Sequence, residues 1–167
     1  TTGTDNTFIG DNAGGATTTA NNNTAVGSSA LLVNTTGTAN TAVGRNAGDA
    51  ITTGNYNTAI GESALTSCTT SEYNTAVGKS AMLETTTGAS NTAVGYFALK
   101  LNTTGATNTA VGTSALAANT TAGDNVGVGY LALTTNTTGA ANTGLGKSAL
   151  RLNTTGQHLT AVGYGAL

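Results

Sequence analysis

The chain has 167 residues, of which 7% are charged and 4% aromatic, and its net charge is −2. The lack of a basic surplus argues against a nucleic-acid partner, because nucleic-acid binding depends on Lys and Arg. No apolar run approaches the roughly 20 residues of a membrane-spanning helix, so no membrane partner is expected. A single cysteine, Cys68, excludes an internal disulfide framework.

A pentapeptide close to Asn-Thr-Ala-Val-Gly recurs every 17 residues, without insertion or deletion. Its copies start at Asn6, Asn23, Asn40, Asn57, Asn74, Asn91, Asn108, Asn125, Asn142 and Leu159. We number the repeat unit from this residue, so that unit position 1 is Asn91 in the unit 91–107. A spacing held over ten copies indicates identical stacked turns. Residues 1–167 are therefore expected to form one repetitive segment.

Unit positions 1–4 predict a short β-strand, because Thr and Val are β-branched. Residues two apart share a face of a strand, and we expect Thr and Val of positions 2 and 4 to face the interior, since Val126 replaces Thr in one unit. Glycine at position 5 is expected to form a bend at positive φ. A second strand is expected over Ala and Leu of positions 8 and 9. The Thr-Thr pair of positions 13 and 14, which starts with Thr1-Thr2, then leads into another turn.

All twelve charged residues lie at unit positions 6, 10, 11, 16 and 17. Burying an unpaired charge is costly, so these positions are expected to face water. Helical repeats need about 33 residues per unit, which excludes them here. The predicted fold class is all-β, a β-solenoid (β-roll or β-helix) of about ten coils with a rise of about 4.8 Å each. Stacked Asn and Thr side chains are expected to form hydrogen-bonded ladders along the axis. The handedness and the number of strands per coil, two or three, stay open.

Assembly is predicted from positions 8 and 9. Adjacent residues of a strand point to opposite faces, so either the Ala or the Leu column would form an apolar stripe on the outside. We therefore expect self-association as a homotrimer; the alternative is a wider monomeric coil with both columns inside. Because the chain starts and stops within a unit, we expect a segment of a longer fibre, with an end-to-end filament as the alternative.

No catalytic, cofactor or metal site is expected, and no enzyme activity. His158 is the only histidine, and no second His or Cys is present to complete a zinc site with Cys68. Acidic residues are scattered, whereas calcium-binding solenoids carry one per turn. The candidate surface-recognition residues occupy positions 6 and 7, where they are suited to stack on sugars; the alternative is ordinary surface decoration. They are Tyr96, Phe97, Tyr130, Leu131 and Tyr164.

The unit N-T-A-V-G-Y-x-A-L-x-x-N-T-T-G, as in residues 91–105, resembles tandem repeats of tail-fibre-like proteins of phages and marine bacteria. It is similar, more distantly, to the head repeats of trimeric autotransporter adhesins. The resemblance implies an extracellular homotrimeric fibre on a virion or bacterial cell surface, acting as a rod-like spacer or presenting a surface to host glycans. The alternative function is ice binding through Thr ladders. Against it, only one Thr of each Thr-Thr pair would point outward, so the pair supplies no array of two columns.

Overall fold

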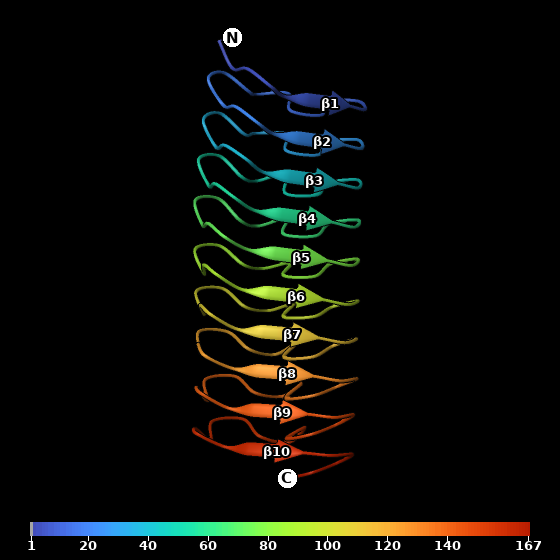
Figure 1. Cartoon of the computed structure of the whole chain (residues 1–167), viewed down its shortest axis with the longest axis vertical. Coiled ribbons are helices and arrows are strands. Elements are labelled where there is room, and N and C mark those ends of the chain that lie inside the picture. The colour runs from blue at the N-terminus through green and yellow to red at the C-terminus, as the bar shows by residue number, and fades with distance from the viewer. Residues whose placement is uncertain (1) are drawn as a thin grey trace.

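The computed structural model describes residues 2–167, so Thr1 of the first Thr-Thr pair lies outside the described residues. Ten parallel strands form one sheet in the order β1 to β10 and stack along the long axis (Figure 1). Each strand pairs with the equivalent residues of the next unit, as Thr92 pairs with Thr109. The strands are β1 Thr7–Ile9, β2 Thr24–Val26, β3 Thr41–Val43, β4 Thr58–Ile60, β5 Thr75–Val77, β6 Thr92–Val94, β7 Thr109–Val111, β8 Val126–Val128, β9 Thr143–Leu145 and β10 Thr160–Val162. The predicted all-β solenoid is confirmed, with about nine coils between the first and last strand.

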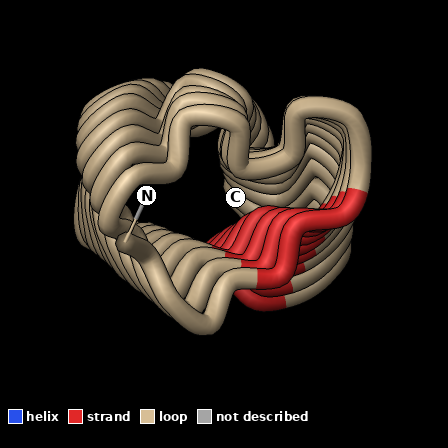
Figure 2. Tube along the Cα trace, turned by 90° about the horizontal axis from the view of Figure 1, so that it is seen from above, coloured by secondary structure: helices blue, strands red, loops and turns tan. Residues whose placement is uncertain are grey.

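Each coil contains one strand, and turns form the rest of its outline (Figure 2). The predicted second strand over positions 8 and 9 is wrong, because the backbone adopts positive φ at positions 7 and 9. In the sixth unit Phe97 has φ 57° and Leu99 has φ 52°. Two turns result: Ala98 N donates to Gly95 O at 3.2 Å, and Asn102 N donates to Leu99 O at 3.4 Å. Left-handed residues remove the strict alternation of a strand, so neighbouring side chains are free to share a direction.

The interior is formed by Ala at position 3, Ala at position 8 and Leu at position 9. Ala93, Ala98 and Leu99 are all completely buried, and the same columns are buried in most other coils. The expected apolar stripe on the outside is therefore absent from the described residues, and the alternative of a coil with both columns inside is the one observed. The expectation that Thr and Val of positions 2 and 4 face the interior is also wrong. Both are partly exposed, and the alanine between them faces inward.

In each of two coils, a larger side chain at one interior position is accompanied by a glycine at another. In the first, Phe8 replaces the alanine of position 3 and Gly14 replaces the leucine of position 9; a Cβ on Gly14 would lie 2.6 Å from the Phe8 ring. In the third, Gly48 replaces the leucine, and its added Cβ would lie 2.9 Å from Cδ1 of Ile51, a buried residue at position 12. The interior therefore keeps its filling by pairing a large residue with a glycine.

Polar ladders join successive coils, as the repeat predicts. The Asn91 side chain is buried; its Oδ1 accepts a hydrogen bond from Asn108 N at 2.9 Å, and its Nδ2 donates to Gly105 O at 2.9 Å. At position 13, Thr103 Oγ1 donates to Thr120 O at 3.1 Å. These bonds satisfy polar groups in an interior that offers little apolar area.

The glycine of position 5 makes the predicted bend. Gly112 has φ +128°, and an added Cβ would lie 2.6 Å from Gly129 O of the next coil. The position therefore excludes a side chain for two reasons, namely the backbone conformation and the close approach of the next coil.

Candidate functional site

The outer side of the sheet presents two continuous columns of side chains, which we call the Thr/Val face. It consists of the residues at unit positions 2 and 4 of all ten strands. The position 2 column is Thr7, Thr24, Thr41, Thr58, Thr75, Thr92, Thr109, Val126, Thr143 and Thr160. The position 4 column is Ile9, Val26, Val43, Ile60, Val77, Val94, Val111, Val128, Leu145 and Val162.

The Thr/Val face is uncharged, and all of its side chains except Leu145 are β-branched. Such side chains have few χ1 rotamers, so their methyl groups hold fixed positions. Val94 remains 37% exposed and Ile60 39% exposed although coils flank them on both sides. The face is therefore a regular and partly apolar surface with no cover from the described residues. Sequence reasoning missed it, because it assigned these columns to the interior.

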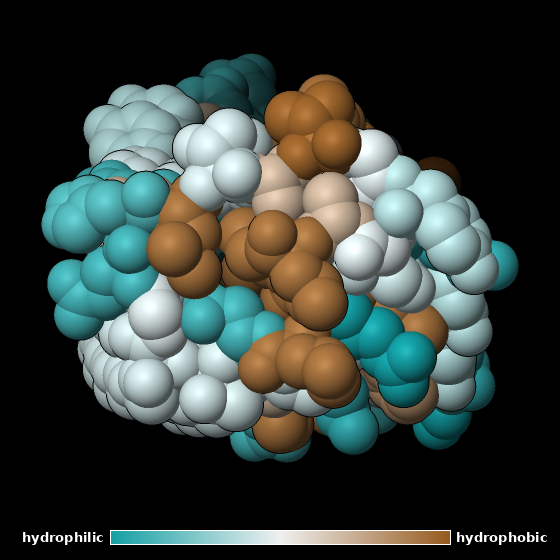
Figure 3. Space-filling view, turned by 90° about the horizontal axis from the view of Figure 1, so that it is seen from below, coloured by the Kyte–Doolittle hydropathy of each residue, from teal (hydrophilic) through white to brown (hydrophobic). Residues whose placement is uncertain are grey.

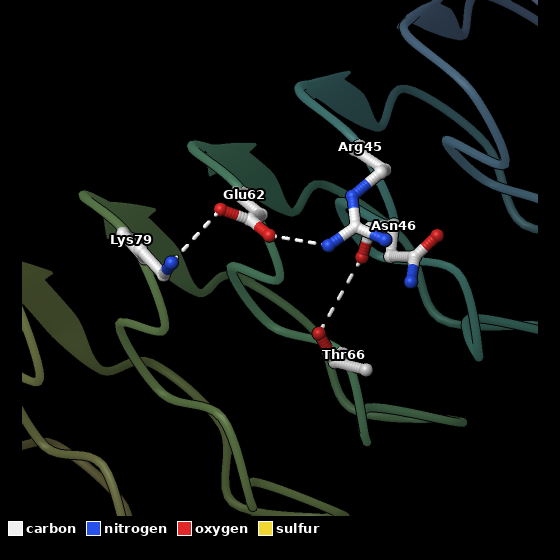
Figure 4. Close-up of polar contacts among 5 residues, drawn as sticks. All are labelled: Arg45, Asn46, Glu62, Thr66 and Lys79. Carbon is white, nitrogen blue, oxygen red and sulfur yellow. Dashed lines mark hydrogen bonds and ion pairs between the residues drawn. The ribbon is translucent and has the colours of Figure 1, made fainter.

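A second outward ladder runs along position 6. Arg45, Glu62 and Lys79 form consecutive rungs, in which Glu62 accepts from Arg45 Nη2 through one oxygen and lies 3.0 Å from Lys79 Nζ through the other (Figure 4). The hydrogen bond from Arg45 and then that from Lys79 hold the pKa of Glu62 below its ordinary value. The three side chains are exposed or half-buried, and solvent screening keeps the contribution of such pairs to stability small.

The predicted recognition residues fall into two separate groups. Tyr96 and Phe97 stack at 3.9 Å between ring centroids, with Lys100 Nζ 4.5 Å from the Phe97 ring. Tyr130 and Tyr164 lie two coils apart on position 6, and Lys147 Nζ lies between them, 5.8 Å and 5.3 Å from the two ring centroids. We call Tyr96, Phe97, Tyr130 and Tyr164 the aromatic ridge.

Leu131, the fifth predicted residue, is half-buried beside the ridge. Sequence reasoning missed Lys100 and Lys147, although Lys147 stands in the same column as the tyrosines. It also missed a pair at position 17, Tyr56 and Tyr73, whose rings stack at 5.1 Å and are nearly parallel.

Cys68 and His158 do not form a reactive site with other groups. Cys68 is buried, its Sγ lies 2.9 Å from Ser71 Oγ, and burial raises the pKa of its thiol. A neutral, buried thiol is a poor nucleophile. His158 is exposed. Within residues 2–167, no three His, Cys, Asp or Glu side chains come close enough together to hold a metal ion.

The pKa of Asp49 is raised above its ordinary value, and the main cause is desolvation by burial. It occupies position 10, is half-buried, and its Oδ1 has no hydrogen-bond partner. Backbone hydrogen bonds from Asp49 and Ala50 offset part of this desolvation. General acid-base chemistry also needs a second positioned group.

Two hollows lie at opposite ends of the rod. One, of about 410 Å³, is lined by Phe8, Gly14 and neighbouring residues of the first coil. The other, of about 270 Å³, is lined by Leu152, Tyr164 and Leu167 among others. The C-terminal end shows a cluster of apolar side chains (Figure 3). Phe8 and Gly14 belong to interior columns, so the first hollow reflects the open cross-section of the coil, whereas the second is lined mostly by outward positions.

No family model matches the chain, and neither the curated proteins nor the solved structures contain a match to it. Among the described residues, no helix has the length and apolar character needed to cross a membrane. Functional inference for this protein therefore depends on the geometry of its repeated surfaces.

Proposed function

We propose that this chain is a rod-like structural segment of an extracellular fibre, such as a phage tail fibre or a bacterial cell-surface fibre. The observation that carries the proposal is the uniform bonding between coils. Each strand contacts only the strands of adjacent coils, and the same axial hydrogen bonds recur at each step. In such a solenoid the length depends only on the number of units.

Stability along the rod comes from neighbour-to-neighbour terms rather than from one central core. The Asn108 side chain repeats the role of Asn91, because its Oδ1 accepts from Asn125 N at 3.0 Å and its Nδ2 donates to Ala122 O at 2.8 Å. Each added coil contributes a similar set of bonds, as a spacer of adjustable length requires.

A deletion experiment tests the modular rod. Removing residues 74–107, two whole units, should leave a folded chain whose longest dimension falls by about 10 Å in small-angle X-ray scattering. Removing residues 74–98 instead breaks the phase of the repeat, so the ladders on the two sides of the junction no longer align and the chain should have a lower urea midpoint, followed by circular dichroism, than the two-unit deletion. Unfolding of the two-unit deletion would contradict the proposal.

The aromatic ridge is the surface that we propose for contact with host glycans. Tyr96 is 46% exposed, Tyr130 50% and Tyr164 79%, so their rings are open to stacking. On a glycan array, binding should be lost in the Tyr96→Ala and Tyr130→Ala variants. It should persist in Tyr73→Ala, an exposed aromatic at position 17. Equal binding by all variants would remove the ridge from the proposal and leave the spacer.

The homotrimer is kept as a prediction on the resemblance alone, since the Leu/Ala stripe first expected to mediate it is buried. Light scattering tests it directly. A mass of three chains supports the trimer, a mass of one chain excludes it, and open-ended growth supports the filament.

A further inference from the structure

The Thr/Val face belongs to an all-parallel sheet, and such sheets are usually covered on both faces. Here the inner side is covered by the coil, and the outer side is bare among the described residues. We propose that the Thr/Val face binds ice, by holding an ordered layer of water that joins the crystal surface. This inference is independent of the proposed role as a spacer.

The geometry of the face is a two-dimensional net. Neighbouring strands are spaced by about 4.8 Å, and residues two apart along a strand by about 6.7 Å. The in-register pairing, for example Thr75 with Thr92 and Val77 with Val94, repeats the same rectangle along the whole rod. These two spacings are of the same order as those between oxygen atoms on a prism face of ice.

The hydroxyl groups of this face are available to water. The position 2 threonines within residues 2–167 are half-buried or exposed, and none of their hydroxyls is buried without a partner, so water can reach them, as at Thr92 and Thr109. At position 13, in contrast, hydroxyls are used inside the protein, as when Thr86 Oγ1 donates to Thr103 O at 3.1 Å. The position 2 column therefore offers a free hydroxyl and a fixed methyl at nearly every rung.

The Thr/Val face suits ice binding better than the Thr-Thr pairs do. The second Thr of each pair, such as Thr104, is exposed. Its neighbours are Thr103, whose hydroxyl is bonded inside the protein, and the buried Gly105, so it forms a single column of free hydroxyls rather than a net. The sheet supplies the second outward column that the pairs lack.

Other occupants of the Thr/Val face fit less well. Three residues at about 3.3 Å and ten strands at about 4.8 Å give an area of roughly 480 Å² per chain. A face-to-face pair would bury roughly 960 Å², below the roughly 1,200 Å² at which stable interfaces begin. A charged ligand would meet no charge on the face. Ice has an uncharged and periodic surface, so it matches the uncharged and regularly spaced side chains of the Thr/Val face.

The test is ice recrystallisation inhibition at micromolar protein, together with thermal hysteresis. The wild-type chain should inhibit recrystallisation. Thr92→Tyr, which places a ring in the net, should weaken the inhibition several-fold. Thr104→Tyr, an equal change on the single column, should not. Circular dichroism and the urea midpoint of both variants show that they are folded.

Three outcomes overturn the inference. One is a wild-type chain that inhibits no better than an unrelated soluble protein at equal concentration. Another is an equal loss in the Thr92 and Thr104 variants. The third is a wild-type dimer in light scattering that Thr92→Tyr dissociates, which would make the face an interface between copies. The deletion series that tests the rod is unaffected by any of these results.

Discussion

The third coil contains a natural pair of compensating residues, and exchanging them tests how the interior is packed. Gly48 and Ile51 stand where the preceding coil has Leu31 and Asn34. Gly48 lies against Cδ1 of Ile51, which is buried. We predict that Gly48→Leu and Ile51→Asn each destabilise the protein, whereas the double variant is nearly as stable as wild type.

The magnitudes follow from the local structure. Ile51→Asn removes a buried side chain beside a glycine that has nothing to fill the space, a loss of about 2–5 kcal/mol. Gly48→Leu forces a side chain against Ile51, a cost of about 1–3 kcal/mol. The backbone adds strain, because Gly48 has φ 55°, but Leu31 occupies the same unit position at φ 48°, so the coil accommodates a leucine in this conformation.

In the double variant the leucine takes the place that Leu31 fills one coil earlier. The new asparagine would donate to Asn34 Oδ1, a buried atom that has no hydrogen-bond partner in the wild type. The same bond exists further along, where Asn119 Nδ2 donates to Asn102 Oδ1 at 3.0 Å. The side-chain oxygen of the new asparagine would itself have no hydrogen-bond donor, so the number of buried oxygen atoms without a partner is unchanged. We expect the net change to be within about 1 kcal/mol.

Urea denaturation followed by circular dichroism measures the four free energies of unfolding. The double-mutant cycle should give a favourable coupling of at least about 2 kcal/mol. Additive effects, with the double variant as unstable as the sum of the two single ones, would refute the volume exchange between Gly48 and Ile51.

Three other changes test the remaining features of the coil. Gly112→Ala should lower the free energy of unfolding by at least about 2 kcal/mol, through backbone strain and the clash with the next coil. Gly163→Ala is the control, because Gly163 has a similar φ but nothing lies within 4 Å of its added Cβ, so this change should cost less. Equal urea midpoints for the two variants would contradict the clash. Asn91→Ala should cost about 2–4 kcal/mol, because it leaves Asn108 N without its acceptor; a fully stable variant would show that the ladder is dispensable. Asp49→Asn should raise the urea midpoint at pH 7, because the raised pKa means that the folded state disfavours the charged carboxylate. Wild type should gain stability as the pH falls through the folded pKa of Asp49, so the advantage of the variant should shrink there; an advantage that grows at low pH would contradict this.

Several features of the fold follow from the sequence alone. A 17-residue period without gaps determines in-register stacking, because any slip would misalign every column at once. Glycine at position 5 predicts a bend, which the φ values confirm. The Asn column predicts an axial ladder, since a repeated amide placed one coil above another pairs with itself. The restriction of charges to five unit positions predicts which positions face solvent; Lys79 at position 6 does, whereas Asp49 at position 10 is half-buried.

The direction of the strand side chains needed the tertiary structure. In Thr-Ala-Val the two β-branched residues and the alanine suit either face of a strand, and apolarity alone favours burying valine. The outcome is decided by the interior, where the leucines of position 9 pack against position 3: a Cβ added to Gly127 would lie 3.1 Å from Leu116 Cγ. Position 3 therefore has room only for a small side chain, so Ala93 faces inward while Thr92 and Val94 are partly exposed.

Leu99 enters the interior because its backbone is left-handed, a conformation that a leucine rarely adopts and that no local propensity predicts. The period, the bends and the polar ladders were thus determined by the sequence, because they depend on identical residues meeting one coil apart. The identity of the outer face, and with it the surface that we propose for ice binding, was decided only by the packing of one wall of the coil against the other.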